Sequence, residues 1–516
     1  MKKFFKVLGI IFGSLIGLLI AIHIILNIVF SIQLHSKIAE LKRKGRPTTI
    51  AEIIPPPVPD EENAAILYSK AFTYGEDKIG RGKLNDIVGT IMREDAMEGF
   101  VSRRKVDTFS GISNLDSKRR KEIQKLINSR NAQYIYKLLE EGSQKLKCRF
   151  DLEYEKGPAM TLPHLSSMRN SMKFLCLKAL VEAEEGNIKG AFNTLLIGLK
   201  MSNHLKDEPI IISQLVRIAC DTIIMECVKN ISSSKGIPVE EIEMIIGELS
   251  HHTDIEPFIR CMDGERVTIG MWGFKRILRA KPRELKEDLN LLPTASMVII
   301  ALIGKPIFKR DFTCYLTVMS KIQDSFDVSY YETFEINNNE AIAKYSLSPS
   351  LFALTTSLSG SENKTYLELI EKQIPRYCII TRTLLPVVAG IRENIKKHSA
   401  NVEICRTGLA LKIYKIKNKT YPEKLENLVP AFLDKVPIDP FSGKNIVYNK
   451  SSSWFQIYSF GPNMRDDGGI SREDKIISSR SLRHSMQSFD GRPVPQFNPV
   501  SVKDYDDYDI VWEYRE

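Results

Sequence analysis

The sequence lacks the short motifs by which most enzymes are recognised. It has no H-E-x-x-H, no G-x-S-x-G, no phosphate-binding Walker loop and no Rossmann glycine pattern. Its 8 cysteines include no C-x-x-C pair, so zinc fingers and thioredoxin-like redox chemistry have no support. Most of these cysteines lie inside apolar helical runs, where cysteine acts as a small core hydrophobe. The motifs therefore identify no reaction.

The chain also lacks a pattern typical of nucleic-acid binding. Its formal net charge is +10, but the basic residues are spread along the chain with acidic residues among them. The densest basic clusters are 42–44, 103–105 and 118–121, and none alternates with the aromatic residues that stack on bases. Solvated helix faces explain these clusters better, and we expect no nucleic-acid partner.

The sequence also has no second apolar run as long as the one at the N-terminus. The apolar stretch Leu289–Phe308 has an uninterrupted core, Ala295–Ile303, that is too short to cross a bilayer. We therefore expect a buried or membrane-surface segment there.

Hydrophobic residues make up 43% and charged residues 26% of the 516 residues, a composition typical of a folded protein. A chain of this length is expected to form two to four domains.

One long apolar run is present, at the N-terminus. After the basic start Met1–Lys6, residues Val7–Leu34 carry no formal charge and exceed the roughly 20 residues that a spanning helix needs. A cleaved signal peptide would have a shorter core and a small-residue cleavage site, which Ser31–Gln33 does not supply. We interpret this run as an uncleaved signal anchor that contacts membrane lipid through residues 7–34.

The centre of the chain is typical of a helical protein. Its clearest pair, Leu165–Glu185 and Ile188–His204, is joined by Gly186 and Asn187 and resembles one tetratricopeptide unit. We find no second copy at a period of about 34 residues, so an ordinary αα-hairpin explains the pattern equally well. Next to it, His251 and His252 point about 100° apart on a helix, so they do not form an i, i+4 metal pair.

In residues Thr407–Gly469, helix-ending and turn-forming residues separate the expected elements more closely than elsewhere in the chain. A helical apolar face ends at Asn418-Lys419, and a short second helix follows Tyr421-Pro422. Turn residues then lead into two β-rich runs, Ile446–Tyr448 and Trp454–Phe460, which predict a hairpin.

This order resembles the globular domain of the major pseudopilins of type II secretion. Their pattern is a helix, YP-x-x-L-x-x-L-V-P, a DP-x-x-G turn, and a hairpin followed by an acidic, glycine-rich loop. The resemblance covers about one eighth of the chain, and an ordinary pseudopilin differs in joining this module directly to an N-terminal helix with a glutamate near its start. The matching residues are Tyr421, Pro422, Leu425, Leu428, Val429, Pro430, Asp439, Pro440, Gly443, Tyr448, Ser459, Gly461 and Gly469.

The resemblance also implies a calcium site, because the major pseudopilins bind calcium in this acidic loop. The residues that correspond here are Asp466, Asp467, Asp507 and Asp509. Carboxylate oxygens on flexible backbone suit calcium. An insertion of residues 470–503 separates the two halves, and an acidic solvated turn followed by a final edge strand is the alternative.

We therefore expect a mainly α fold: a transmembrane helix, an α-helical domain that is a tetratricopeptide-like candidate, and a small α+β module. The expected parts are a signal anchor at 1–36, a basic and proline-rich linker at 37–63, a helical domain at 64–285, a second mostly helical region at 286–397 and the pseudopilin-like module at 398–516.

Two orientations in the membrane are open. The basic residues of 37–46 outnumber those of 1–6, which favours a cytoplasmic C-terminal side. Long domains translocate largely regardless of charge, however, and the resemblance implies a location outside the cytoplasm. We predict a single-pass protein of the inner, or cytoplasmic, membrane with its C-terminal bulk outside.

The function that we expect is non-enzymatic. We interpret the chain as an interaction or structural protein of the cell envelope, linked to a secretion or pilus-like system, with protein partners and no identified small-molecule substrate. The alternatives are a tetratricopeptide-like scaffold with an added module, and a membrane-bound hydrolase whose site lacks a readable motif.

Overall fold

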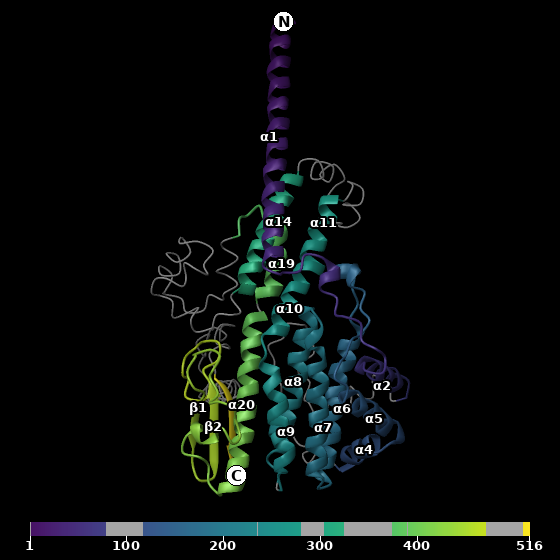
Figure 1. Ribbon diagram of the computed structural model, residues 1–516, viewed down its shortest axis with the longest axis vertical. Coiled ribbons are helices and arrows are strands. Elements are labelled where there is room, and N and C mark those ends of the chain that lie inside the picture. The colour runs from purple at the N-terminus through teal and green to yellow at the C-terminus, as the bar shows by residue number, and fades with distance from the viewer. Residues whose placement is uncertain are drawn as a thin grey trace, which may run out of the picture.

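The computed structural model describes residues 2–78, 117–234, 236–279, 304–324, 374–389, 391–470 and 509–515. In these residues the protein is mainly helical, with one three-stranded antiparallel sheet near the C-terminus, which confirms the predicted mixture of elements. Figure 1 shows an elongated body from which a single helix projects at one end. The predicted metal ligand Asp507 and most of the apolar stretch Leu289–Phe308 lie outside the described residues.

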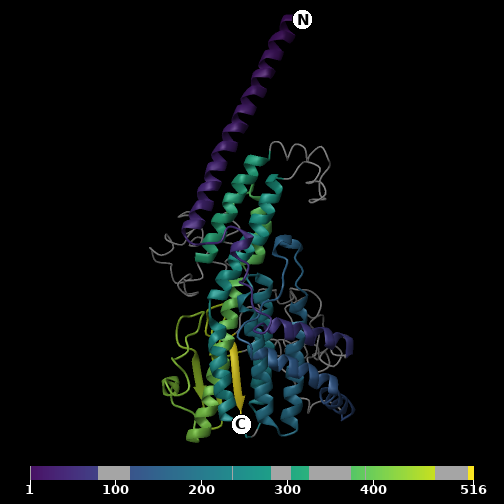
Figure 2. The same cartoon turned by 45° about the vertical axis from the view of Figure 1, so that its right-hand side comes forward.

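The projecting helix α1 (Lys2–Arg43) is continuous past residue 36, where the sequence predicts its end. Among the described residues, Phe4–Arg43 is the one helix long and apolar enough to cross a membrane. Its residues from Phe4 to Ile22 are exposed among the described parts of the chain. Figure 2 shows that this part leaves the body obliquely.

The second half of α1 packs against α14 (Lys305–Asp324). The α1 residues that turn toward α14 and the body recur every three or four positions, which is one face of a helix. The two helices run in parallel, since Lys309 contacts Asn27 and Ser31 while Asp324 contacts Lys44. The face consists of Asn27, Ser31, Leu34, Ile38 and Leu41.

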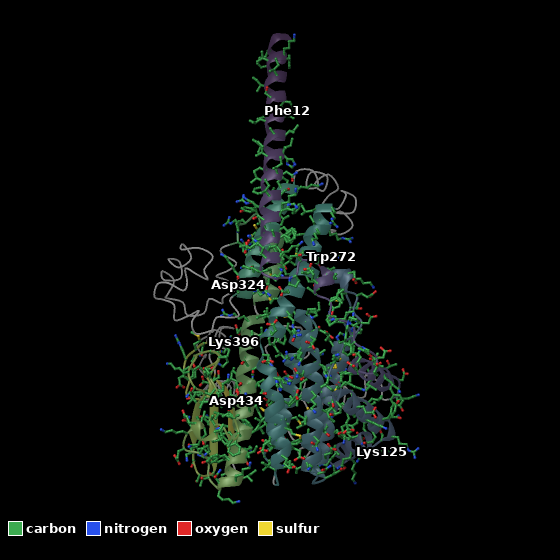
Figure 3. The ribbon with its side chains drawn as sticks, in the orientation of Figure 1. Phe12, Lys125, Trp272, Asp324, Lys396 and Asp434 are labelled. Carbon is green, nitrogen blue, oxygen red and sulfur yellow. The ribbon has the colours of Figure 1, made fainter. Side chains whose placement is uncertain are left out.

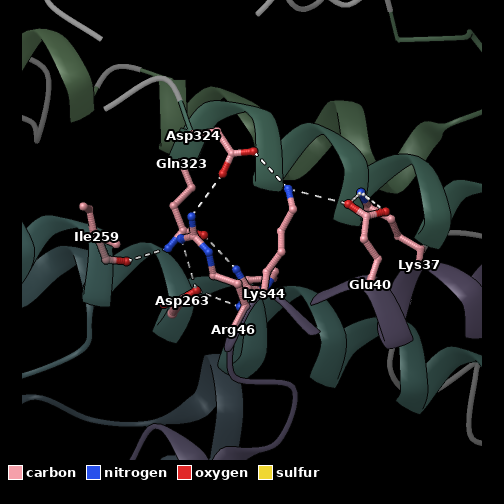
Figure 4. A network of polar contacts seen from close by, with 9 residues as sticks. Lys37, Glu40, Lys44, Arg46, Ile259, Asp263, Gln323 and Asp324 are labelled. Atoms are coloured by element: carbon pink, nitrogen blue, oxygen red, sulfur yellow. Dashed lines mark hydrogen bonds and ion pairs between the residues drawn. The ribbon is translucent and has the colours of Figure 1, made fainter. Parts of the chain in front are cut away.

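A polar network holds the end of α1 to the body (Figure 4). Lys44 and Arg46 both reach the carboxylate of Asp324, at 3.4 and 3.0 Å. Arg266, which is fully buried, pairs with Asp263 at 2.7 Å and donates to the carbonyl of Pro47 at 2.8 Å. The buried guanidinium is thus neutralised, and α1 has a fixed connection to the helices below it.

Beside the second half of α1 the chain forms a helical hairpin that leads back toward the end from which α1 projects (Figure 1). The helix α10 (Glu256–Glu265) continues through a π-helical turn η6 (Arg266–Met271) into α11 (Trp272–Arg279). α11 packs against α14, and Phe274 stacks on Phe312 with ring centroids 4.7 Å apart. These helices and α1 share one apolar core with Ile374 and Cys378.

The larger core lies in the helical bundle at the opposite end (Figure 1). The predicted pair is present as α6 and α7, which pack tightly against each other. Gly186 takes φ +83° in the connecting turn, and the side chain of Asn187 accepts a hydrogen bond from the backbone N–H of Gly190. The bundle helices are α2 (Ala64–Lys78), α4 (Ser117–Ile127), α5 (Arg130–Ser143), α6 (Pro163–Glu184), α7 (Ile188–Asn203), α8 (Ile211–Ile231) and α9 (Val239–Ser250).

The long helix α20 (Ile391–Asn418) joins the bundle to the sheet. It follows α19 (Ile379–Ala389) and packs on α8 and α9 with one face and on the sheet with another. The predicted module boundary at residue 398 therefore falls inside a continuous helix. The remaining helical elements of the described residues are short turns: η1 (Ile50–Glu52), η3 (Tyr154–Ala159), η4 (His204–Asp207), η5 (His251–Thr253) and η8 (Leu425–Leu428).

The sheet confirms the predicted hairpin and adds the last strand to it. β1 (Val447–Lys450) pairs with β2 (Trp454–Ser459), and β2 pairs with β3 (Ile510–Arg515), both antiparallel. Phe455 and Ile457 on β2 are fully buried and belong to the same core as the bundle. The sheet is thus packed onto the helical body through α20.

Candidate functional site

The acidic loop after β2 is the first candidate site, and Asp509 ties it to β3. One carboxylate oxygen of Asp509 accepts a hydrogen bond from the backbone N–H of Gly469 at 2.7 Å. The other accepts from the backbone N–H of Asp467 at 3.4 Å. Because Asp509 is 1% exposed, these two donors stabilise a carboxylate that burial would otherwise destabilise.

Two more of the predicted metal ligands lie in the same loop. Asp466 accepts hydrogen bonds at 2.9 Å from the hydroxyl of Tyr458 and from the backbone N–H of Gly468. Asp467 accepts from the side-chain amide of Asn463, also at 2.9 Å. Three of the four predicted ligands are therefore gathered at one end of the sheet, and the fourth, Asp507, lies outside the described residues.

The electrostatics of the loop follow from this crowding. Burial raises the pKa of Asp509, and the nearby carboxylates of Asp467 and Asp466 raise it further. The backbone N–H groups of Gly469 and Asp467 oppose the rise, and the resulting pKa of Asp509 is about 6. A cation at this position would relieve the repulsion among the three carboxylates.

The donor set has the chemistry of a hard-cation site. All three side chains offer carboxylate oxygens, which are the ligands that calcium prefers. Among the described residues, however, no group of three or more histidine, cysteine, aspartate or glutamate side chains is arranged closely enough to hold a metal ion. The calcium site that the resemblance implies therefore stays a prediction.

A second polar cluster lies in the middle of the helical bundle, around Asp221 of α8. One of its carboxylate oxygens is 2.9 Å from Nδ1 of His252 and 3.2 Å from Nε2 of His398. The hydroxyl of Ser202 on α7 donates to the other oxygen. Through these contacts four elements, α7, α8, η5 and α20, meet at one carboxylate. Asp221 and His252 are both wholly buried.

In this cluster, burial and the neighbouring charged groups shift the pKa values in opposite directions. Burial raises the pKa of Asp221, but His252 and His398 oppose this more strongly and hold the pKa of that carboxyl well below its usual range. Burial lowers the pKa of His252, yet Asp221 and Glu248 raise it by more, so its pKa lies above the ordinary value. In this buried pair the neighbouring carboxylates thus favour the protonated form of His252, and the two imidazoles favour the ionised form of Asp221.

The sequence reasoning found only part of this cluster. It singled out His251 and His252 as neighbours that do not share an ion, and the structure leaves His251 exposed while His252 is buried. It missed Asp221 and His398. A readable signal was present, because Asp221 is an acid inside the otherwise apolar helical run IACDTII, where an unpaired carboxylate would be costly.

The DP-x-x-G turn places a third carboxylate, Asp439, behind the hairpin. Asp439 is 1% exposed. Its two oxygens accept hydrogen bonds from the hydroxyls of Ser459 and Ser442, both at 2.6 Å, and from the backbone N–H groups of Phe441 and Phe460, at 3.1 and 3.2 Å. Both carboxylate oxygens of Asp439 are thus bound by donors of the turn and of the end of β2. We interpret Asp439 as a structural residue that links these two segments.

Comparison of the chain with protein-family models, with curated proteins and with solved structures finds no match in any of the three. The pseudopilin resemblance of Thr407–Gly469 therefore rests on the sequence pattern, and it stays a prediction.

Proposed function

We propose that the protein is a single-pass membrane-anchored interaction protein of the cell envelope, without enzymatic activity, whose body lies outside the cytoplasm and serves a secretion or pilus-like system. The observation that carries the anchor is the division of α1 into an exposed apolar half and a half packed on α14. The exposed part, Phe4–Ile22, is about 28 Å long at 1.5 Å per residue, close to the thickness of a bilayer core.

The second half of α1 supports a structural role. Lys309, Asp324 and Arg266 hold it at both ends, so the anchor and the body form one continuous unit. A flexible linker would let the body move freely over the membrane, whereas this connection sets its position. A fixed position suits a protein that presents a surface to partners.

The buried polar groups also favour a structural interpretation. Asp221 joins helices in the bundle, and Asp439 joins the turn to β2. In each case the carboxylate is directed at protein donors and is enclosed by them. Such groups specify how elements pack, because protein donors use the hydrogen-bonding capacity of the buried carboxylates.

The α6–α7 pair keeps a second candidate open, a tetratricopeptide-like scaffold. Its two antiparallel helices have the small residues and turn that such a unit has, with Gly198 of α7 against Ile224 of α8. In this alternative the helical bundle binds the partners, and the sheet at the C-terminus is an addition.

We also propose that the acidic loop binds calcium. Asp466, Asp467 and Asp509 provide oxygen donors, and the raised pKa of Asp509 reflects the charge crowding that a cation would relieve. The bound ion would hold the loop against β3 and keep the surface of the module ordered.

The anchor is tested by deleting residues 4–22 from the full chain. This removes the exposed turns and leaves the α1 face that packs on α14, so the body should fold and appear in the soluble fraction. The intact chain should sediment with membranes washed at high salt and alkaline pH. A deletion protein that still sediments with washed membranes would mean that another segment, with Leu289–Phe308 first among them, holds it there.

The orientation is tested with the intact chain by a C-terminal fusion. A reporter that is active only outside the cytoplasm should be active when it follows Glu516. If the fusion protein is stable and the reporter inactive, the body is cytoplasmic and the link to secretion fails, while the anchor stands.

A further inference from the structure

The described segments at the end of the body from which α1 emerges are strongly basic. Three segments meet there: α11, the first turns of α14, and residues 374–389 before and within α19 (Figure 1). Within 272–279, 305–311 and 374–389 the chain has eight basic residues and one acidic residue. We call the basic residues the basic collar; they are Lys275, Arg276, Arg279, Lys305, Lys309, Arg310, Arg376 and Arg382.

The packing places these segments at a common level. Phe274 of α11 stacks on Phe312 of the antiparallel helix α14, so Arg279 and Lys305 both lie on the membrane side of that pair. The guanidinium of Arg310 lies 4.3 Å from the centre of the Tyr377 ring, which brings the segment before α19 to the same level.

The single acidic residue of these segments does not neutralise the outer surface. Asp311 is 1% exposed, and its carboxylate accepts hydrogen bonds from the backbone N–H groups of Ile380 and Thr381 at 2.9 and 3.2 Å. Its charge is therefore directed into the body. Arg279, Lys305 and Arg376, by contrast, are exposed.

The collar is fixed relative to the membrane helix. Nζ of Lys309 is 2.7 Å from Oδ1 of Asn27 and 2.7 Å from Oγ of Ser31, and Arg310 lies over the ring of Phe30 at 5.3 Å. The exposed apolar turns of α1 begin just beyond these contacts. If those turns fill the bilayer core, the collar lies at the level of the lipid headgroups.

Apolar side chains accompany the charges. Ile307, Tyr377 and Ile379 are 48%, 38% and 69% exposed, and all three belong to the segments that carry the collar. Exposed aliphatic and tyrosine side chains next to lysine and arginine are typical of surfaces that lie at the boundary between headgroups and acyl chains.

We propose that the basic collar binds the anionic phosphate headgroups of the membrane that α1 crosses, and so sets the body upright on the bilayer. The proposal rests on the membrane anchoring proposed above. The lipid is chosen by charge: basic side chains near an anionic bilayer are attracted to it, and the attraction is screened by salt.

The test measures which lipids the intact protein retains. The full chain is solubilised in mild detergent with equal amounts of phosphatidylglycerol and phosphatidylcholine, and bound lipids are counted by native mass spectrometry. We expect a several-fold preference for phosphatidylglycerol that falls as salt is raised. Equal retention of the two lipids would overturn the proposal.

A variant with Arg279→Gln, Lys305→Gln and Arg376→Gln removes three exposed charges of the collar. It should lose most of the preference while keeping the melting temperature of the parent protein. The matched control, Lys118→Gln, Lys121→Gln and Lys125→Gln, removes three exposed charges from α4 at the opposite end, where Figure 3 shows Lys125. It should keep the preference; an unchanged preference in the collar variant, or an equal loss in the control, would contradict the proposal.

The two proposals fail in different ways. If the anchor proposal is wrong, the intact chain will wash off membranes whatever their composition. If only the collar proposal is wrong, the chain will stay with membranes, and the collar variant will retain the same lipids as the parent protein.

Discussion

Gly408 of α20 lies directly beneath the ring of Trp512 on β3. A Cβ atom at Gly408 would overlap the six-membered ring, so the absence of a side chain is what lets the last strand approach the helix. Trp512 is 6% exposed and meets Phe455 edge to face, with ring centroids 5.8 Å apart. This contact joins the C-terminal strand to the helix that also packs on the bundle.

Replacing Gly408 by alanine should therefore loosen β3. Overpacking of this kind costs about 1–3 kcal/mol. Hydrogen exchange of the full chain should show faster exchange in β2 and β3 and little change in α6 and α7. The smaller ring of Trp512→Phe should recover part of the loss when the two changes are combined.

Gly247→Ala is the matched control, because nothing lies within 4 Å of the position that its Cβ would take on α9. Alanine should be neutral or slightly stabilising there, since it favours helix more than glycine does. Equal effects of the two substitutions would show that Trp512 does not limit the residue at position 408.

Asp439 should be essential for the order of the hairpin. Asp439→Asn keeps the shape but turns an amide toward Ser442, Ser459 and buried backbone donors. Buried donors left without an acceptor cost about 1–3 kcal/mol each, so we expect a loss of about 3 kcal/mol in the stability of the module.

The measurement is the protection of β1 and β2 amides against hydrogen exchange in the full chain. Glu423→Gln serves as the control, because Glu423 is 83% exposed and forms an ion pair with Lys450 at the surface. Its loss should change little. If Asp439→Asn leaves the hairpin as protected as this control does, the proposed role of Asp439 is wrong.

The Asp221 cluster predicts a stability change that depends on pH. His252 has a pKa raised by folding, so it contributes stability below about pH 6.5 and loses it as pH rises through the folded value. Asp221 has a lowered pKa, so it contributes above about pH 4 and loses that contribution as pH falls through the folded value. The pair contributes most between these limits.

Asp221→Asn should therefore destabilise the bundle by about 3 kcal/mol near pH 6. The loss should be smaller toward pH 9, because the contribution of His252 falls as pH rises through its raised folded pKa. The other titratable groups that face the pair are Arg217 of α8, Glu248 of α9 and His398 of α20, and the substitution leaves these residues in place. Melting temperatures across this pH range provide the measurement.

Asp207→Asn is the control for the same chemical change at a half-exposed ion pair with Arg260. It should cost little at any pH. A loss for Asp221→Asn that is the same at pH 6 and pH 9 would show that the carboxylate acts without a protonated His252.

Calcium should stabilise the acidic loop and β3. At one hundred times its dissociation constant a ligand adds about 2.7 kcal/mol to the state that binds it. The experiment uses the full chain, because the module shares its core with the bundle through α20. Exchange of the Gly469 amide should slow in millimolar calcium relative to chelator, and magnesium should act less, since it requires tighter octahedral geometry.

The calcium effect should disappear with Asp467→Ala and remain with Glu423→Ala. It should also weaken below about pH 6, where Asp509 becomes protonated, because a carboxylic acid is a poor ligand for a cation. Identical exchange in calcium and in chelator would remove the metal site and leave a solvated acidic turn.

The sequence by itself determined the elements whose signals are local. The uncharged run Val7–Leu34 predicts a long apolar helix, Gly186-Asn187 predicts the turn between α6 and α7, and the β-rich run Trp454–Phe460 predicts a strand. In each case the structure agrees, because an apolar run, a turn residue and a β-rich run are all properties of neighbouring residues.

The tertiary structure decided which distant residues meet. Asp221, His252 and His398 lie on separate helices, and no sequence period links them. The same holds for Lys309 on Asn27 and for Trp512 on Gly408. The position of the basic collar likewise depends on how α11, α14 and α19 pack beside α1. Such contacts arise from the packing of whole helices, in which a buried charge or a missing Cβ is tolerated only because its partner arrives from elsewhere in the chain.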